Sequence, residues 1–425
     1  MQQTAGDTGP SLQAECEIIW RAIMSALEKK VLFTSCFLLI SGLMAVDFFN
    51  PSLPYIMSDL GASQTAAKTL IVVYMLTLGL AQFFYGTFSD RYGRRPAILV
   101  GFAVAAAGLA GSSFCRDMSL LYVARAVTAF GTAGCTVISR AIIVDVFRDQ
   151  KAMKKAFSYF AMSSQFSPAI APLIGGVIQQ YYGWSMSFLT LSGIMAGSFL
   201  CLLLFMPETH PHRAGQVAGL RGVYLPYLQL MGNLEFVLYS VASAVIFAYT
   251  IGFYATSPYV FHALGYSPVG NSLFYLSYSA GILSGSWIMG HVLAAMSPGR
   301  LYIGTIAGYT VLCAAGMPFD IGGSGATIVL FSGVMGTVCG VAAPLALVLS
   351  MTGVETSRGA ASALQGAIKM FFTGLFMIGF DVIHVRSFLS LNAVFAAFTL
   401  LLWLIAGVDR LARAGADKRR RETPA

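Results

Sequence analysis

The chain has 425 residues, of which 57% are hydrophobic and only 10% are Asp, Glu, Lys or Arg, and its formal net charge is +8. Soluble domains carry about 25% charged residues, so this composition excludes an ordinary water-soluble globule. Apolar stretches of about 20 residues, the length that crosses a hydrocarbon layer about 30 Å thick, recur along the chain. They are too long and too uniformly apolar for barrel strands, so the sequence predicts an all-α polytopic membrane protein.

Twelve apolar runs predict twelve transmembrane helices, with six on each side of a polar segment. The first six lie at residues 31–50, 66–88, 97–115, 119–146, 156–181 and 185–206, and the second six at residues 234–257, 268–294, 300–319, 325–350, 358–380 and 387–408. The chain is thereby divided into an N-tail (1–30), an N-terminal half (31–206), a central loop (207–233), a C-terminal half (234–408) and a basic C-tail (409–425).

The distribution of basic residues predicts the orientation in the membrane. Lys and Arg are retained on the cytoplasmic side, and most of the 26 basic residues fall in alternate loops and in the C-tail. This pattern indicates that both termini are cytoplasmic. Because topology already explains the basic residues, we expect no nucleic-acid partner, although the tail at residues 418–421 is suited to contact anionic lipid.

The segment between the second and third runs, residues 86–96, carries a distinctive pattern. Its glycines permit a tight turn, Arg94 and Arg95 suit the inner interface, and Asp90 is a carboxylate able to cap a helix. A plain cytoplasmic loop explains the arginines but neither Asp90 nor the glycine spacing. The segment resembles the loop signature of the major facilitator superfamily, and the surrounding sequence is similar to that family's Bcr/CflA group of drug:proton antiporters.

The resemblance extends over nearly the whole chain. Further similar segments are residues 47–56 with 59–63 in and after the first span, residues 140–145 at the end of the fourth, and the weaker marker at residues 207–209. Arg125 matches the family's buried arginine, although Thr128 and Ala129 stand where glutamine and glycine are typical. The fifth span resembles the antiporter motif, with Ala171 replacing its first glycine; the matching positions are Pro168, Pro172, Gly175 and Gly176.

This resemblance implies two six-helix bundles around a central cavity that opens alternately to each side. It also implies a small-molecule substrate, the proton gradient as energy source and no cofactor. The chain has no phosphate-binding P-loop and no hydrolase or metalloprotease motif, so neither ATP-driven pumping nor enzymatic activity is expected. We expect no metal site.

Asp47 is the only carboxylate well inside an apolar run, which makes it a candidate for proton coupling. Counting along the helices, Asp47 lies about 24 Å from the inner edge and Arg125 about 9 Å from the outer edge. In a core about 30 Å thick these depths nearly coincide, so we predict that the two side chains face each other. The alternatives are a static structural pair, or an Asp47 that already lies at the outer interface.

Lys369 lies about 18 Å into the eleventh span, where no acidic residue is close in sequence. A mid-membrane ammonium needs a partner or water, so Lys369 is predicted to contact an anionic or zwitterionic substrate, or to pair with Asp47. Tyr249 and Tyr254 are candidates for the wall of a pocket for flat apolar compounds. Helix packing is the alternative for both tyrosines.

Two further groups are predicted to govern conformational change. Asp90, Arg94, Arg140 and Asp145 are expected to form a charge cluster at the inner face, and the resemblance implies that this cluster stabilises the outward-open state and breaks when the bundles rock. The alternative is that some of these side chains are merely interfacial. In the fifth span, the two prolines bend the helix and the two glycines allow close helix contact. A role for that motif in blocking proton leak is implied by the resemblance alone.

These features predict a monomeric proton-coupled exporter of small organic molecules in the bacterial inner membrane, with Asp47 as proton carrier and Arg125 tuning it. The first alternative is a proton-linked importer or exporter of an anionic metabolite or siderophore held by Lys369 and Arg125. A second alternative is a non-transporting receptor or scaffold, although the short loops disfavour it.

Overall fold

The computed structural model describes the backbone of residues 12–147, 150–209, 220–291, 296–316, 325–352, 354, 358–382 and 388–422. The elements of this part of the chain are all helical. In chain order they are α1 (Leu12–Asp47), the 3-10 helix η1 (Asn50–Ser52), α2 (Leu53–Asp59), α3 (Gln64–Tyr92), α4 (Arg94–Phe114), α5 (Met118–Val146), α6 (Gln150–Tyr182), α7 (Trp184–Phe205), α8 (Leu220–Met231), α9 (Leu234–Ala263), α10 (Pro268–His291), α11 (Pro298–Gly316), α12 (Gly325–Met351), α13 (Arg358–Val382) and α14 (Phe388–Glu422).

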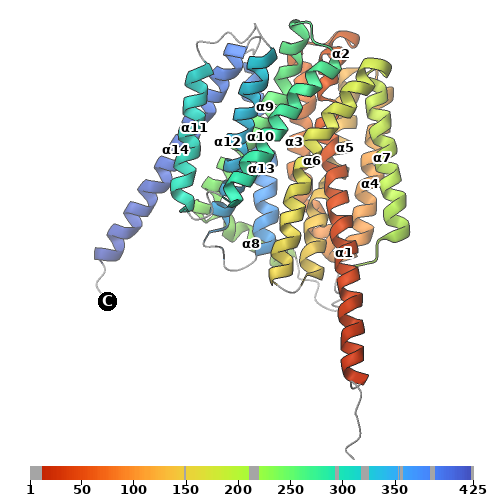
Figure 1. Ribbon diagram of the computed structural model, residues 1–425, viewed down its shortest axis with the longest axis vertical. Coiled ribbons are helices and arrows are strands. Elements are labelled where there is room, and N and C mark those ends of the chain that lie inside the picture. The colour runs from red at the N-terminus through yellow and green to blue at the C-terminus, as the bar shows by residue number, and fades with distance from the viewer. Residues whose placement is uncertain are drawn as a thin grey trace, which may run out of the picture.

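The predicted all-helical membrane fold is confirmed, and each predicted run overlaps a long helix. Within the described residues, nine segments are long and apolar enough to cross a membrane; they are α1 continued into α2, then α3, α4, α5, α7, α9, α12, α13 and α14. The remaining predicted spans correspond to α6, α10 and α11, which have 33, 24 and 19 residues and run beside the others (Figure 1).

The helices extend beyond the apolar runs at both ends of the chain. Helix α1 begins at Leu12, within the predicted N-tail, and α14 continues to Glu422, within the predicted C-tail. Hydropathy marks only the apolar part of a helix, whereas Ala, Lys, Arg and Glu continue it readily into water. At the other extreme, Gly93 and Gly183 each form a one-residue connection with positive φ, which glycine adopts without strain.

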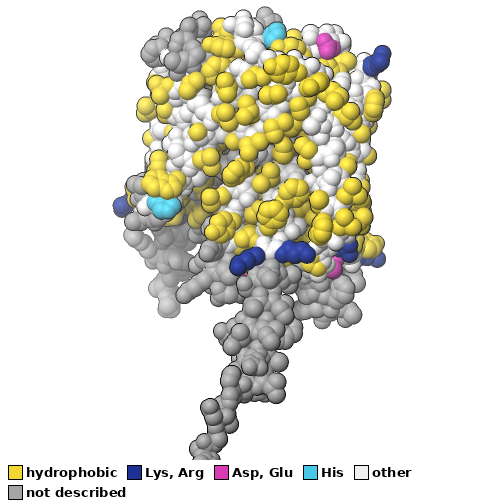
Figure 2. All heavy atoms as spheres, turned by 45° about the vertical axis from the view of Figure 1, so that its right-hand side comes forward, with side chains coloured by type: hydrophobic (Ala, Val, Ile, Leu, Met, Phe, Trp, Pro, Cys, Tyr) yellow, Lys and Arg dark blue, Asp and Glu magenta, His cyan; other side chains and the backbone are white. Residues whose placement is uncertain are grey.

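The helices form two groups. Helices α1 and α3 to α7 pack together as the N-terminal bundle, and α9 to α14 pack together as the C-terminal bundle (Figure 1). The bundles meet where α3 packs on α13, where α6 packs on α10, and where η1 and α2 approach α9 and α10. Hydrophobic side chains cover the lateral surface, and Lys and Arg gather at the rim where Figure 1 shows both terminal helices projecting (Figure 2). We call this rim the basic end.

Small residues bring α3 and α13 close together across the bundle interface. A methyl group at Gly79 would lie 2.8 Å from the backbone nitrogen of Phe371, and one at Gly374 would lie 2.9 Å from the Leu76 side chain. Without a hydrophobic driving force between helices in lipid, such close packing is a main source of association. The α3–α13 contact is therefore a tight seam between the two bundles.

Candidate functional site

Arg125 is buried in the N-terminal bundle, with only 1% of its surface exposed. Both terminal nitrogens of its guanidinium donate to the backbone carbonyl of Ala45 at 3.2 Å, which joins α5 to the last turns of α1. The guanidinium carbon lies 4.1 Å from the ring centroid of Phe49 and 4.4 Å from that of Tyr74. Aromatic faces attract a desolvated cation, so the two rings hold this side chain in place.

Asp47 ends α1 and is 4% exposed, with its Oδ1 atom buried and without a hydrogen bond. Its charge acts on Tyr74 of α3 and on Tyr254 and Tyr275 of the C-terminal bundle. Asp47 comes just before η1, which packs on α9 and α10, so it lies at the junction of the two bundles. Among the described residues no ion pair joins Asp47 to Arg125. Both side chains are instead close enough to Tyr74 for their charges to interact with its hydroxyl group.

Tyr254 belongs to a cluster of aromatic side chains between α9 and α10. Its hydroxyl hydrogen-bonds the Ser279 hydroxyl at 3.1 Å, and its ring makes an edge contact with Tyr275 at a centroid distance of 4.8 Å. The Tyr275 hydroxyl donates to the Tyr254 carbonyl at 3.1 Å. The charge of Asp47 interacts with the hydroxyl group of Tyr254, so Tyr254 stays a candidate residue of the site.

Tyr249 lies away from the bundle junction, inside the C-terminal bundle. Its hydroxyl donates to the Phe395 carbonyl at 2.9 Å and lies 2.6 Å from the Thr399 hydroxyl, both on α14. Its ring stacks on Tyr309 of α11 at a centroid distance of 4.4 Å. The hydroxyl group and one face of the Tyr249 ring are thus engaged in helix packing. We therefore leave Tyr249 out of the candidate substrate site.

Lys369 is partly exposed near the middle of α13. Its ammonium lies 4.7 Å from the ring centroid of Phe247 on α9. It forms no ion pair with Asp47 or with any other carboxylate in the described part of the chain, and the charged group that acts on it most strongly is the guanidinium of Arg140. The lysine is therefore a cation held beside another cation.

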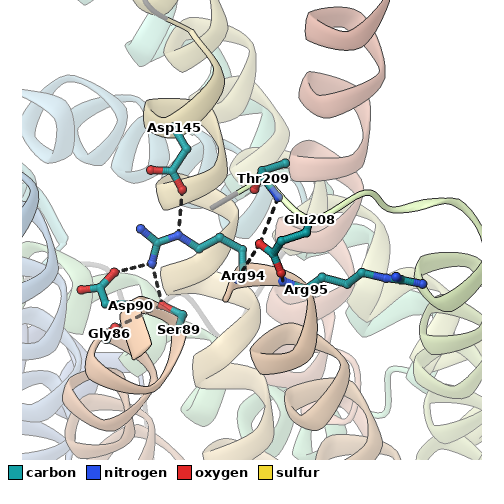
Figure 3. Close-up of polar contacts among 8 residues, drawn as sticks. All are labelled: Gly86, Ser89, Asp90, Arg94, Arg95, Asp145, Glu208 and Thr209. Atoms are coloured by element: carbon teal, nitrogen blue, oxygen red, sulfur yellow. Dashed lines mark hydrogen bonds and ion pairs between the residues drawn. The ribbon is translucent and has the colours of Figure 1, made fainter. Parts of the chain in front are cut away.

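The predicted charge cluster at the basic end centres on Arg94 (Figure 3). Its Nε donates to Asp145 at 2.8 Å, and its Nη1 donates to Asp90 at 2.5 Å and to the Ser89 hydroxyl at 2.8 Å. These contacts tie α3, α4 and α5 together. Because all three helices belong to the N-terminal bundle, the cluster fixes the shape of that bundle's basic end.

Arg140 stands apart from this cluster, contrary to the predicted grouping. It makes no ion pair with Asp90 or Asp145, all three residues being described. At 3.6 residues per turn, residues five apart on a helix point about 140° away from each other, so Arg140 and Asp145 occupy different faces of α5. Arg140 instead reaches α13, where its Nη1 lies 3.4 Å from the position of a methyl group at Gly366.

Pro172 and Gly176 of α6 lie in the contact with α10 of the C-terminal bundle, at the end opposite the basic end, and Gly175 lies against Phe48, which follows α1. The Ser272 hydroxyl of α10 donates to the Pro172 carbonyl at 2.8 Å. A methyl group at Gly175 would collide with the Phe48 carbonyl oxygen, and one at Gly176 with the Ser272 hydroxyl. Pro168 and Pro172 lie inside the helix, where each removes a backbone donor. These residues let α1, α6 and α10 close against one another.

Sequence reasoning missed two further groups of charges. Glu208 accepts hydrogen bonds from the backbone nitrogens of Arg94 at 2.9 Å and Arg95 at 3.1 Å, and so caps the start of α4 (Figure 3). Its partner is more than a hundred residues away, and only the family marker at residues 207–209 drew attention to it. In the C-terminal bundle, Arg413 pairs with Asp409 and Glu235 at 3.0 and 2.7 Å. The i,i+4 spacing of Asp409 and Arg413 was the available signal.

Residues 35–379 match the sequence model of the Major Facilitator Superfamily. Similar proteins include Multidrug resistance protein D of Escherichia coli, 30% identical over 250 residues, which are 59% of this chain and 62% of that protein, less than two thirds of its length. The Chloramphenicol resistance protein of Pseudomonas aeruginosa is 28% identical over 69% of each chain. A crystal structure of a POT family transporter in complex with 5-aminolevulinic acid, 14% identical, superposes with a TM-score of 0.69 over 89% of this chain and 95% of that one, which supports the fold.

Proposed function

Because the chain belongs to the major facilitator superfamily, whose members are transporters and not enzymes, we propose that it is a proton-coupled antiporter that exports small organic molecules. The observation that carries this proposal is Asp47, a buried carboxyl at the bundle junction whose Oδ1 has no hydrogen-bond donor. Intramembrane carboxyls of this kind are default candidates for proton handling. Relatives named for multidrug and chloramphenicol resistance support export of drug-like compounds.

Asp47 is proposed to bind a proton in one conformation and release it in another. A charged carboxylate sealed among protein atoms without donors is costly, so protonation favours the state in which Asp47 is enclosed. Opening of the junction to water favours the charged form. Since Asp47 acts on tyrosines of both bundles, its charge is suited to bias how those bundles pack.

Arg125 is proposed to position Asp47 through the backbone. Its two hydrogen bonds to the Ala45 carbonyl fix the chain two residues before Asp47. Its positive charge also reaches the same tyrosine, Tyr74, as the charge of Asp47. The arginine is thus a positioning residue that shapes the electrostatic environment of the proton carrier.

Alternating access is proposed to move the contacts at the two ends of the bundles. At the end opposite the basic end, Gly175 and Ser272 lie in the closed contact, and the Tyr55 ring of α2 meets His262 of α9 at a centroid distance of 5.3 Å. At the basic end, Arg94 with Asp90 and Asp145 holds the N-terminal bundle in one shape. We propose that this cluster is the conformational switch and that α6 seals the opposite end.

The chain is a multi-pass membrane protein, and we place its basic end in the cytoplasm of a bacterial cell. The rim of Lys and Arg in Figure 2 supports this orientation, since basic residues are retained on the cytoplasmic side. Both termini are then cytoplasmic, and the protein works as a monomer. One proton returning down a potential of 100 mV supplies about 2.3 kcal/mol, enough for roughly fiftyfold accumulation at one-to-one coupling.

The proposal is tested in inside-out membrane vesicles with chloramphenicol as the first probe. Adding the compound to energised vesicles is expected to release protons from the lumen when the wild-type protein is present, and not when Asp47→Asn is present. Asp59→Asn is the matched control, because Asp59 is a carboxylate of the neighbouring α2 that accepts a hydrogen bond from Trp184 at 2.9 Å. Equal proton release by wild type and Asp47→Asn rejects Asp47 as the carrier.

A second candidate function is proton-linked transport of an anionic metabolite or siderophore, in either direction. Lys369 favours it, because a half-buried ammonium without a carboxylate partner among the described residues suits an anion. Counterflow of labelled organic anions in oriented vesicles, compared between wild type and Lys369→Met, distinguishes this function from export of neutral drugs.

A further inference from the structure

Two cations from different bundles, Arg140 of α5 and Lys369 of α13, lie near each other. Arg140 projects from α5 and brings its Nη1 within 3.4 Å of the methyl position at Gly366 on α13. Lys369 lies three residues further along α13, on the same side of the helix. Of the charged groups that act on Lys369, Arg140 acts most strongly. The two positive charges therefore lie close together across the seam between the bundles.

No carboxylate of the described chain neutralises this pair. Asp90 and Asp145 bind Arg94, and Glu235 and Asp409 bind Arg413. The Phe247 ring, 4.7 Å from the Lys369 ammonium at its centroid, attracts the cation but carries no negative charge. Two like charges in a low-dielectric region repel each other, and each is costly to keep there without a counter-ion.

The surroundings of the pair suit an oxyanion. Arg140 and Lys369 are each only partly buried. Gln82 of α3 brings its Oε1 within 2.9 Å of the same methyl position at Gly366, which places an amide beside the guanidinium. An arginine fork binds carboxylate or phosphate oxygens through two parallel hydrogen bonds, and a lysine adds a point charge.

We propose that Arg140 and Lys369 together bind the carboxylate or phosphate group of an organic anion, which is the transported substrate. The proposal rests on the transport function proposed above and specifies its substrate class. The bound anion bridges α5 of the N-terminal bundle and α13 of the C-terminal bundle. Its negative charge attracts both Arg140 and Lys369 and so offsets the repulsion between them. Substrate binding thereby favours the conformation in which the two helices are close.

The glycine at position 366 belongs to the same arrangement. A methyl group there would lie 2.9 Å from the Gln82 Oε1 atom, which must shift, and in ordinary contact, at 3.4 Å, with the Arg140 Nη1 atom. Gly366→Ala is therefore expected to move the Gln82 amide away from the Arg140 guanidinium and to weaken anion binding while leaving both charges in the protein. Gly379 of the same helix meets nothing within 4 Å of its methyl position, so Gly379→Ala is the matched control.

The test measures binding to the purified full-length protein in lipid nanodiscs by calorimetry and thermal shift. The probes are benzoate, phenyl phosphate and the neutral isostere benzamide, each at up to about 10 mM, which saturates a site with a Kd of about 1 mM. We expect both anions, or the one whose oxyanion fits, to bind and raise the melting temperature, and benzamide to do neither. The anion that binds more tightly shows whether the site prefers a carboxylate or a phosphate.

Variants locate the site. Arg140→Gln and Lys369→Met are each expected to weaken anion binding tenfold or more. Lys369→Arg is expected to retain part of the binding that Lys369→Met loses. Arg300→Gln removes an exposed cation and is expected to bind anions as the wild type does. Removing either cation also relieves repulsion, so neither variant is expected to melt at a lower temperature without ligand. Three results would each overturn the proposal. The protein binds benzamide as strongly as the anions, or Arg140→Gln and Lys369→Met both bind the anions as the wild type does, or the wild type binds neither anion.

One further variant separates this inference from the proposed function. Asp47→Asn is expected to bind anions as the wild type does, while losing proton coupling. Loss of anion binding in Arg140→Gln together with proton release that does not depend on Asp47 rejects the proton-carrier role alone. Export of chloramphenicol that depends on Asp47, in a protein that binds no anion, rejects the oxyanion site alone.

Discussion

The guanidinium of Arg125 binds the backbone carbonyl of Ala45, with both terminal nitrogens at 3.2 Å. The depths of the two residues along their helices instead predict that Arg125 faces the carboxylate of Asp47. A bond to the backbone leaves that carboxylate able to gain or lose a proton without breaking the arginine's own contacts. The arginine thus fixes the end of α1, and the two nearby rings of Phe49 and Tyr74 fix the arginine.

Replacing Arg125 by lysine is expected to impair both stability and transport. Lysine keeps the charge but loses the planar fork and its stacking on the two rings. Hydrogen bonds from charged groups contribute about 1.5–3 kcal/mol, so we expect a lower melting temperature and transport reduced to less than a tenth of wild type. Thermal unfolding in detergent and vesicle transport measure the two effects. Wild-type transport by Arg125→Lys would show that charge alone suffices.

The two carboxylates that bind Arg94 are expected to differ in importance. The Asp145 side chain is 13% exposed and the Asp90 side chain is 63% exposed. Breaking a buried pair costs about 3–5 kcal/mol, whereas exposed pairs are worth about 0–1 kcal/mol. Asp145→Asn is therefore expected to shift the conformational equilibrium and lower transport far more than Asp90→Asn. Spin-label distances across the basic end check this order, and a larger effect of Asp90→Asn contradicts it.

Gly175→Ala is expected to open the end of the molecule opposite the basic end. Its new methyl group would collide with the Phe48 carbonyl, and overpacking of this kind costs about 1–3 kcal/mol. The reaction of a cysteine placed at Ser272 with a membrane-impermeant maleimide, added from the side opposite the basic end, reports the opening. Gly193→Ala is the control, because nothing lies within 4 Å of its methyl position. Equal labelling in both variants would remove α6 from the seal.

Tyr249→Phe is expected to affect stability without affecting substrate binding. The variant loses the hydrogen bonds to Phe395 and Thr399 but keeps the ring stacked on Tyr309. One neutral hydrogen bond contributes about 1 kcal/mol, so a small fall in melting temperature is expected with an unchanged KM. Tyr254→Phe, at the junction near Asp47, is the comparison. A raised KM in Tyr249→Phe would return that residue to the substrate site.

Hydropathy and loop signatures predicted much of the fold, for identifiable reasons. Apolar runs of about 20 residues mark spans regardless of their neighbours, and each run overlaps a helix in the structure. The Arg94 cluster could be predicted because Asp90 and Arg94 are four residues apart, about one turn of helix, and Asp145 carries the charge opposite to that of Arg94. Local sequence was informative for partners close in the chain such as Asp90 and Arg94, although the Asp409–Arg413 pair, at the same spacing, was missed.

Contacts between distant helices could not be predicted in the same way. Depth along a helix placed Asp47 and Arg125 at one level, but the rotation of each helix decides which atoms meet, and Arg125 meets the Ala45 carbonyl. The same rotation turns Arg140 away from Asp145 and toward Gly366. Tyr249 likewise faces α14 because of packing that one sequence does not reveal.

The most direct test of the account separates substrate movement from proton movement at Asp47. Purified protein in proteoliposomes is loaded with a compound identified by a susceptibility screen, and the experiment compares exchange of labelled compound at equilibrium with uptake driven by an imposed pH gradient. Asp47→Asn is predicted to exchange the compound at a rate similar to wild type and to accumulate none of it against a concentration gradient. Gradient-driven accumulation by Asp47→Asn at the wild-type level would contradict the account.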